Sequence, residues 1–211
     1  MSEAAAKVLE EKRAKNAIRG LHHFAIGTTD MLKTKAFYTD LVGLPHSQTW
    51  REEFPDGPNR SKKYMHCFFE LGDGSALAFF QFADGHRPPP GKLPATVFEH
   101  HIALKMNSTR EVLEMREKLT QANLASALMD HGYCYSLYTR DPNGMLVEFA
   151  ADPEGIEDVF VQKANTASDE LAQWLGGDLT PANMHRSYDG NKLPVSSIDE
   201  INAVSVPPVH R

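Results

Sequence analysis

The sequence predicts an α+β fold built from two βαβββ modules, with helical and irregular extensions at both ends. Two observations predict this fold. Strands and a helix follow in the same order twice, and short stretches of the two halves align, with residues 21–26 (LHHFAI) matching residues 99–104 (EHHIAL). A segment with three consecutive prolines, residues 88–90, separates the halves. A repeated supersecondary unit of this kind indicates that the two halves form one duplicated domain.

The repeats set the domain boundaries. The modules are predicted at about 19–83 and 97–152, with a linker at 84–96, so that the paired domain spans 19–152. Residues 1–18 are rich in Ala, Glu and Lys without an apolar core, which predicts an exposed helix and not a signal peptide. Residues 153–211 form a C-terminal extension, with a helix in its first half and a Pro-, Asn- and Ser-rich tail expected to have no core of its own.

In the first module, hydrophobic periodicity and turn residues define the elements. The predicted order is a strand at 20–27, a helix at 31–41, a polar loop at 51–62 and strands at 63–71 and 75–82. Asp30 is placed to cap the helix, and Gly43 is placed to end it. The tight turn Gly72-Asp73-Gly74 joins the last two strands.

The second module repeats this order. A strand is predicted at 98–105, a helix at 109–121 and strands at 125–129, 133–139 and 145–150. The turn Asp141-Pro142-Asn143-Gly144 separates the last two strands, because proline presets φ and Asn-Gly accepts positive φ. The final strand carries Glu148 among apolar residues, and a carboxylate in such a strand needs a partner.

Composition excludes several classes of protein. The chain has 211 residues, 41% hydrophobic and 24% charged, as in ordinary globular domains. A formal charge of -6 argues against a nucleic-acid partner. No apolar run approaches the roughly 20 residues that a membrane span needs. Only two cysteines are present, so no disulfide framework is expected and a reducing cytoplasm fits best.

Strand alternation selects three candidate metal ligands. His23 and His101 lie at equivalent positions of the two modules, on the strand face expected to point away from the helix. Small residues two positions later, Ala25 and Ala103, leave space beside them. With Glu148 they supply two neutral imidazoles and one carboxylate, the set found in non-haem Fe(II) oxygenases.

The chain resembles members of the vicinal oxygen chelate superfamily, which includes glyoxalases, fosfomycin and bleomycin resistance proteins and extradiol dioxygenases. The resemblance covers about Arg19 to Asp152. It implies an incomplete mixed β-barrel around a divalent metal, with ligands on the first strand of each module and the last strand of the second. His23, His101 and Glu148 occupy those positions.

Within the superfamily, the extradiol dioxygenases are the most similar. Many isomerase members place a fourth ligand on the last strand of the first module, where this chain has Ala78. The dioxygenase signature is met by His131, Leu137, Tyr138, Asp141, Pro142, Gly144 and Glu148. The resemblance therefore implies an Fe(II)-dependent enzyme that cleaves a catecholic substrate with O2, with Mn(II) or another divalent metal as the alternative.

The resemblance also implies roles for the remaining site residues. His131 and Tyr138 would hydrogen-bond substrate oxygens and supply a proton during O–O cleavage. Ser75 stands where the dioxygenases carry an acid/base histidine. His66 on the neighbouring strand is the candidate to replace it, and the alternative is that His66, between Met65 and Cys67, is a core residue. The expected substrate pocket is lined by Ala25, Ala78, Ala103 and Phe68.

Two other functions remain open. One is a metal-dependent glyoxalase, isomerase or lyase on the same scaffold, which the missing histidine at Ser75 favours. The other is a resistance protein that binds a small molecule without chemistry. In each case we expect a small-molecule partner and a homo-oligomer, a dimer or larger.

Overall fold

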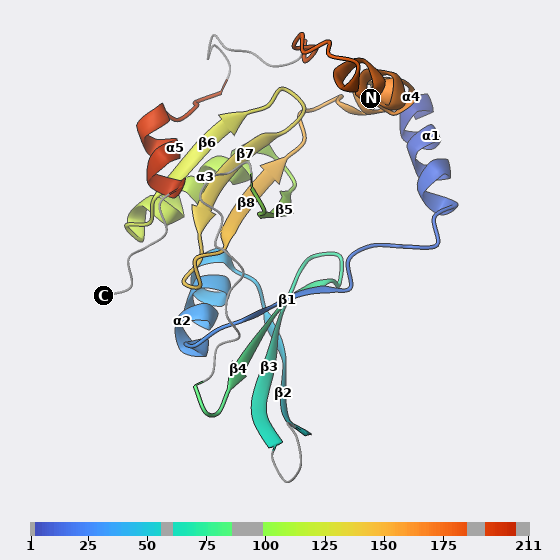
Figure 1. Cartoon of the computed structure of the whole chain (residues 1–211). Helices are drawn as coiled ribbons and strands as arrows, with labels where there is room; N and C mark the ends of the chain where they lie inside the picture. The colour runs from blue at the N-terminus through green and yellow to red at the C-terminus, as the bar shows by residue number, and fades with distance from the viewer. Residues whose placement is uncertain (1–2, 56–60, 86–98, 185–192, 206–211) are drawn as a thin grey trace.

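The computed structural model describes residues 3–55, 61–85, 99–184 and 193–205. The predicted linker lies outside these ranges except for its first two residues. The described chain forms two four-stranded mixed sheets with helices, one sheet from each module (Figure 1). Each sheet follows the order βαβββ, which confirms the predicted duplication.

Sheet A comes from the first module and has the strand order β1-β4-β3-β2. Its elements are β1 (His23–Gly27), α2 (Met31–Lys35), η1 (Ala36–Val42), β2 (His46–Pro55), β3 (Ser61–Glu70) and β4 (Ala76–Phe82). β1 runs parallel to β4, and the other neighbouring pairs are antiparallel.

The prediction of a polar loop at 51–62 was wrong for residues 51–55 and 61–62, and its middle, residues 56–60, lies outside the described residues. Residues 51–55 continue β2, and residues 61–62 begin β3. The two strands pair without interruption from Gln48↔Phe68 to Pro55↔Ser61, so ladder hydrogen bonds hold a stretch whose charged residues resemble a loop. Pro55 fits there because β2 is an edge strand of sheet A, where the missing amide donor of proline is tolerated.

The first-module helix starts as predicted but changes character. Asp30 accepts a hydrogen bond from the Lys33 amide at 3.0 Å, which caps α2. From Ala36 the chain continues as the wider π-helix η1, which sequence periodicity did not predict. Gly43 ends it at a φ of 95°, a conformation that favours glycine.

Sheet B comes from the second module and has the order β5-β8-β7-β6. Its elements are β5 (Ile102–Met106), α3 (Thr109–Gln121), β6 (Ser126–Asp130), β7 (Tyr135–Arg140) and β8 (Leu146–Ala151). β5 starts later than predicted, so His100 and His101 precede the strand. Ser108 accepts from the Glu111 amide and so caps α3, and Glu111 accepts from the amide of Asn107, the residue before the cap.

One hydrophobic core joins the modules. Phe69 and Phe79 of sheet A and Leu137 and Phe149 of sheet B belong to the same buried cluster. Tyr38, fully buried, donates to Asp141 Oδ2 at 3.0 Å and so links η1 to the β7–β8 turn. The described strands form no closed barrel, and α2 lies between the two sheets (Figure 1).

The extensions add three helices, α1 (Glu3–Ala14), α4 (Glu157–Leu175) and α5 (Ile198–Ser205). α1 and α4 lie against each other, far from sheet A (Figure 1). α5 packs on sheet B, where Val204 is 1% exposed beside Tyr138 and Leu146. The described part of the tail therefore packs on the paired domain, and α5 is a helix that the sequence did not predict. None of the described helices has the length and apolarity to span a membrane.

Candidate metal centre

Glu148 lies in the middle of a row across sheet B. β5 pairs Ala103 with Glu148, and β7 pairs Tyr138 with Glu148. Residues paired in register project from the same face of a sheet. This face is opposite to the one that carries the main core residues Leu137 and Phe149. The sheet therefore presents Glu148 and Tyr138 together.

Both oxygens of the Glu148 carboxylate have partners. Glu148 is 5% exposed, and Ser136 Oγ donates to its Oε1 at 2.5 Å. His101 Nε2 lies 2.8 Å from its Oε2. Burial of an unpaired carboxylate would be costly, so this pairing stabilises the charge and fixes its orientation.

His131 and Tyr138 form a second pair on the same face. His131 Nε2 lies 3.1 Å from the Tyr138 hydroxyl. Burial, and then the negative charge of Glu148, raise the pKa of Tyr138 well above the ordinary tyrosine value. The phenol therefore keeps its proton at neutral pH and is available as a hydrogen-bond donor.

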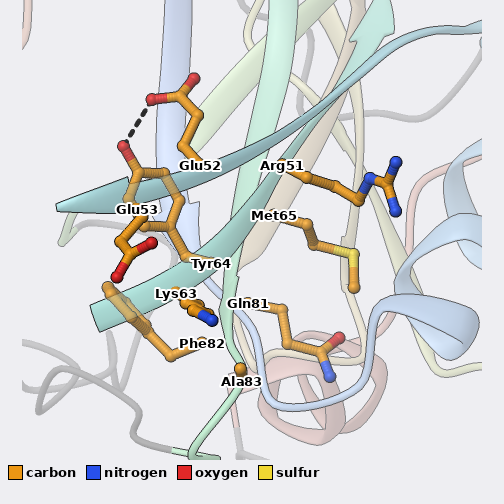
Figure 2. Close-up of a pocket in the computed structure, with 9 residues that line it drawn as sticks. All are labelled: Arg51, Glu52, Glu53, Lys63, Tyr64, Met65, Gln81, Phe82 and Ala83. Atoms are coloured by element: carbon orange, nitrogen blue, oxygen red, sulfur yellow. Dashed lines mark hydrogen bonds between the residues drawn. The ribbon is translucent and has the colours of Figure 1, made fainter. Parts of the chain in front are cut away.

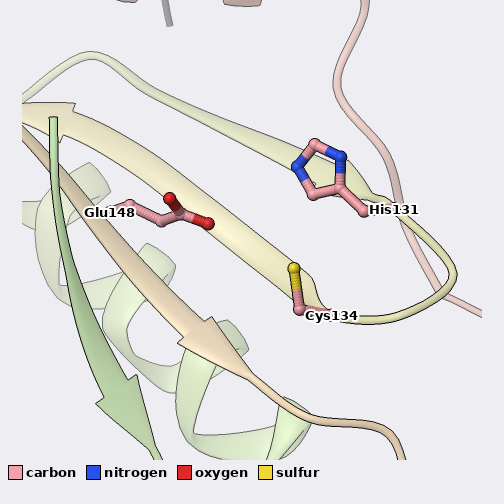
Figure 3. A group of neighbouring side chains, drawn as sticks. All are labelled: His131, Cys134 and Glu148. Atoms are coloured by element: carbon pink, nitrogen blue, oxygen red, sulfur yellow. The ribbon is translucent and has the colours of Figure 1, made fainter. Parts of the chain in front are cut away.

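Cys134 is a third group beside Glu148 that sequence reasoning missed. One ligand atom from each of His131, Cys134 and Glu148 lies within 4.8 Å of the others (Figure 3). Cys134 precedes Ser136 by two residues and therefore projects from the same face of the sheet. The His131-x-x-Cys134 spacing is the sequence signal that points to this pair.

His23 lies on sheet A, where its neighbours are two other histidines and a phenylalanine. Its Nδ1 is 2.7 Å from His22 Nδ1, and its ring centre is 6.0 Å from that of His66 and 5.5 Å from that of Phe68. Over the described part of the chain, the single group of three potential ligands within 4.8 Å is the one with Cys134. One chain does not bring His23 together with His101 and Glu148, and ligation by His23 stays a prediction.

The two sheets repeat the same register. Ala25 pairs with Ala78 as Ala103 pairs with Glu148, so Ala78 occupies the position of Glu148 in the first module. Phe68 pairs with Ala78, as Tyr138 does with Glu148. Ala78 is fully buried and its methyl group has no donor atom, so a metal ligand on the first module must come from another strand.

His66 lies next to His23 on the same face of sheet A. Its ring stacks on Phe80 with centres 3.7 Å apart, and its Nε2 is buried without a hydrogen-bond partner among the described residues. Burial, and then the charge of His23, lower the pKa of His66 below the ordinary value. Ser75 instead donates to Asp73 Oδ1 at 2.6 Å, in its own turn. His66, and not Ser75, is therefore the side chain beside His23 that has a pKa suited to acid/base chemistry.

Two pockets lie away from these residues. The first, about 470 Å³, lies across the ends of β2, β3 and β4 remote from His23, where Tyr64 donates to Glu52 (Figure 2). The second, about 530 Å³, lies between α4 and residues 178–183. Neither pocket is lined by the predicted metal ligands, so neither identifies the substrate site.

The sheet B residues fit a divalent metal. Glu148 supplies a buried carboxylate whose two oxygens are already oriented, and His101 supplies an imidazole in direct contact with it. Nitrogen and carboxylate donors of this kind suit Fe(II), Mn(II) and Zn(II). Ser136 donates a hydrogen bond to the carboxylate and so orients it, as the hydrogen-bond partners of metal ligands typically do.

Comparisons with known proteins identify the family. The model of the Glyoxalase/Bleomycin resistance protein/Dioxygenase superfamily matches residues 20–149, more than half of the chain. A search of curated protein sequences gave no match.

Three solved structures that match the chain each cover about two thirds of it. A glyoxalase/dioxygenase from Nostoc punctiforme is 21% identical, covers 66% of this chain and 95% of its own, and has a TM-score of 0.45. Lactoylglutathione lyase from Agrobacterium tumefaciens is 20% identical, covers 64% of this chain and 96% of its own, and has a TM-score of 0.43. A genomically encoded fosfomycin resistance protein from Listeria monocytogenes is 22% identical, covers 66% of this chain and 98% of its own, and has a TM-score of 0.44. Since the family model covers both modules, the chain belongs to the Glyoxalase/Bleomycin resistance protein/Dioxygenase superfamily.

Proposed function

We propose that this protein is a non-haem Fe(II)-dependent extradiol-type dioxygenase that cleaves a catecholic aromatic substrate with O2. The observation that carries the proposal is the adjacency, on one face of sheet B, of the Glu148–His101 pair and the His131–Tyr138 pair. A carboxylate and an imidazole suit the metal, and a histidine and a protonated tyrosine suit acid/base work beside it. When bound, Fe(II) would hold substrate and O2 together and pass electron density between them.

The protein's own groups then orient the substrate and move protons. The Tyr138 hydroxyl donates a hydrogen bond to a substrate oxygen, because its raised pKa keeps it protonated. His131, in contact with that hydroxyl, supplies and recovers the proton. Ser136 holds Glu148 in one orientation throughout.

The third ligand, His23, is proposed to come from a second copy of the chain. Sheet A presents His23 and His66 on an exposed face with Trp50, which is 55% exposed, while Glu148 lies on sheet B. A dimer in which sheet A of one chain faces sheet B of the other would complete the three-ligand set. The two free cysteines agree with a reducing, cytoplasmic setting.

Mixing two inactive variants tests this arrangement. His23→Ala and Glu148→Gln would each be inactive alone. Random reassociation makes about half of the dimers mixed, and each mixed dimer has one intact site, so activity should return to about a quarter of the wild-type value. No recovery, in a mixture proved to exchange subunits, would contradict a shared site.

The activity itself is tested with an oxygen electrode and a panel of catechols. Protein loaded with Fe(II) under anaerobic conditions should consume one O2 for each ring-opened product. Tyr138→Phe should lower kcat by about 100-fold, in the range of one lost acid/base group. The matched control Tyr64→Phe removes a surface hydroxyl that bonds Glu52 and should leave kcat unchanged. Absence of O2 uptake across the panel, with iron bound, would refute the proposal.

A metal-dependent isomerase, glyoxalase or lyase is the second candidate. Ser75 favours it, because this residue is engaged with Asp73 and provides no acid/base group where the dioxygenases have one. Such an enzyme would turn over without O2 when loaded with Mn(II), Ni(II), Co(II) or Zn(II). Activity in strictly anaerobic buffer therefore separates the two candidates.

A further inference from the structure

We propose that His131, Cys134 and Glu148 form a binding site for Zn²⁺ that one chain completes by itself. The site uses sulfur, nitrogen and oxygen donors and no residue of sheet A. It therefore differs from the proposed iron site in its ligands, although the two overlap at Glu148.

A β-hairpin brings His131 and Cys134 together. β6 pairs with β7 up to Asp130↔Tyr135, and the His131 amide donates to the Cys134 carbonyl at 3.0 Å. Residues that close a hairpin lie directly opposite each other, so their side chains project from the same face. Gly132, at a φ of 77°, provides the left-handed conformation that a two-residue hairpin loop needs.

The loop geometry is reinforced by Asp130. Its Oδ1 accepts a hydrogen bond from the Gly132 amide at 2.8 Å, which holds the start of the turn. Two intervening residues between metal ligands are the spacing typical of paired zinc ligands. The His131-x-x-Cys134 turn is thus a preformed two-ligand unit.

Glu148 faces this unit from β8. Cys134 Sγ is 3.5 Å from Ser136 Oγ, and that hydroxyl donates a hydrogen bond to Glu148. The thiol and the carboxylate therefore lie close together on the same face of the sheet. The three ligand atoms are within 4.8 Å of one another (Figure 3). Zinc–ligand distances of about 2.0–2.3 Å require separations shorter by roughly 1 Å, which side-chain rotation supplies.

The donor set selects the metal. A thiolate with imidazole and carboxylate suits Zn²⁺, which is borderline soft, better than it suits Mg²⁺, Ca²⁺ or Mn²⁺. Three protein ligands leave the fourth tetrahedral position for water or another small ligand. His131 and Cys134 are partly exposed, so an ion can reach them.

Zinc at this site would interfere with iron chemistry. It would take Glu148 away from the iron and occupy His131, the proposed proton donor. This consequence rests on the proposed function, whereas the zinc site does not. Zn²⁺ is therefore predicted to inhibit the Fe(II)-loaded protein. Removal of all metal by EDTA, followed by reloading with Fe(II) under anaerobic conditions, should restore activity.

Co²⁺ titration of the metal-free protein tests the site directly, since Co²⁺ occupies zinc sites and a Co²⁺–thiolate bond absorbs in the near ultraviolet. We expect stoichiometric development of this absorption in the wild type and its loss on addition of Zn²⁺. Cys134→Ser and His131→Ala should abolish the absorption and weaken Zn²⁺ binding by more than about 100-fold, because even outer partners of ligands contribute roughly 10–100-fold.

Two control variants test which cysteine supplies the thiolate and whether sheet A contributes a ligand. Cys67→Ala, which removes the other cysteine, should keep the absorption, and so should His23→Ala. Far-ultraviolet circular dichroism verifies that each variant is folded. Thiolate absorption that persists in folded Cys134→Ser, or Co²⁺ binding without such absorption in the wild type, would overturn the proposal. If Co²⁺ binding were lost in His23→Ala but kept in Cys134→Ser and His131→Ala, the single-chain site would be refuted, whereas the proposed iron site would be unaffected.

Discussion

Replacement of Tyr38 by phenylalanine tests how the two modules are held together. The Tyr38 hydroxyl is fully buried and donates to Asp141, which is 1% exposed. Asp141 also accepts bonds from the amides of Asn143 and Met145 and from the Asn143 side chain. The variant keeps the aromatic ring in the core and removes one of four donors to a buried carboxylate.

The expected loss follows from this geometry. A hydrogen bond to a charged group contributes roughly 1.5–3 kcal/mol, and the remaining donors stay in place, so we expect a loss of about 2 kcal/mol. For a chain of this length, 1 kcal/mol corresponds to about 2–4 °C, which predicts a fall in Tm of about 4–8 °C. Differential scanning calorimetry measures this change.

Tyr64→Phe is the matched control. Its hydroxyl also donates to a carboxylate, that of Glu52 at 2.7 Å, but on the surface, where water replaces the lost bond. Its Tm should stay close to the wild-type value. Tyr38→Phe with a Tm within about 1 °C of wild type would refute the claim that this bond stabilises the contact between the modules.

Three further predictions concern sheet B and pH. Val204→Ala should cost about 2 kcal/mol, because it removes two buried methyl groups and leaves a cavity under α5; an unchanged urea midpoint would contradict this. Ser136→Ala should weaken metal binding by roughly 10–100-fold in a calorimetric titration, because Glu148 loses the donor to its Oε1; unchanged affinity would show that the bond has no orienting role. Burial raises the pKa of Tyr135 to about 12, above its unfolded value of about 10, so this contribution to stability is present below about pH 10 and is lost as the pH rises to about 12. Thermal melts over that range should fall less steeply in Tyr135→Phe than in the wild type.

The duplication and its internal register were predictable from the sequence because they depend on local patterns. The aligned histidines predicted two equivalent strands, and the structure pairs Ala25 with Ala78 as it pairs Ala103 with Glu148. Strand alternation likewise placed His66 on the same face as Phe68, and their rings lie 4.3 Å apart. These relations need only a period of two and a repeat.

Other features depend on information that the repeat does not contain. The charged second half of β2 resembled a loop, since its stability comes from pairing with β3 and not from burial. The position equivalent to Cys134 in the first module is Tyr64, so the repeat did not select the cysteine as a candidate ligand. The hairpin nevertheless places Cys134 opposite His131. The position of His23 relative to Glu148 depends on how whole sheets pack, within one chain or between two, and local sequence does not specify that.

The iron content of Glu148→Gln tests the central claim most directly. Wild type, Glu148→Gln and the surface control Glu117→Gln are loaded with Fe(II) under anaerobic conditions, passed through a desalting column and analysed for iron. The proposed metal centre predicts stoichiometric iron in the wild type and the control, and iron near background in Glu148→Gln, because the buried carboxylate is the proposed anchoring ligand. Full iron content in a folded Glu148→Gln protein would contradict the metal centre and the function built on it.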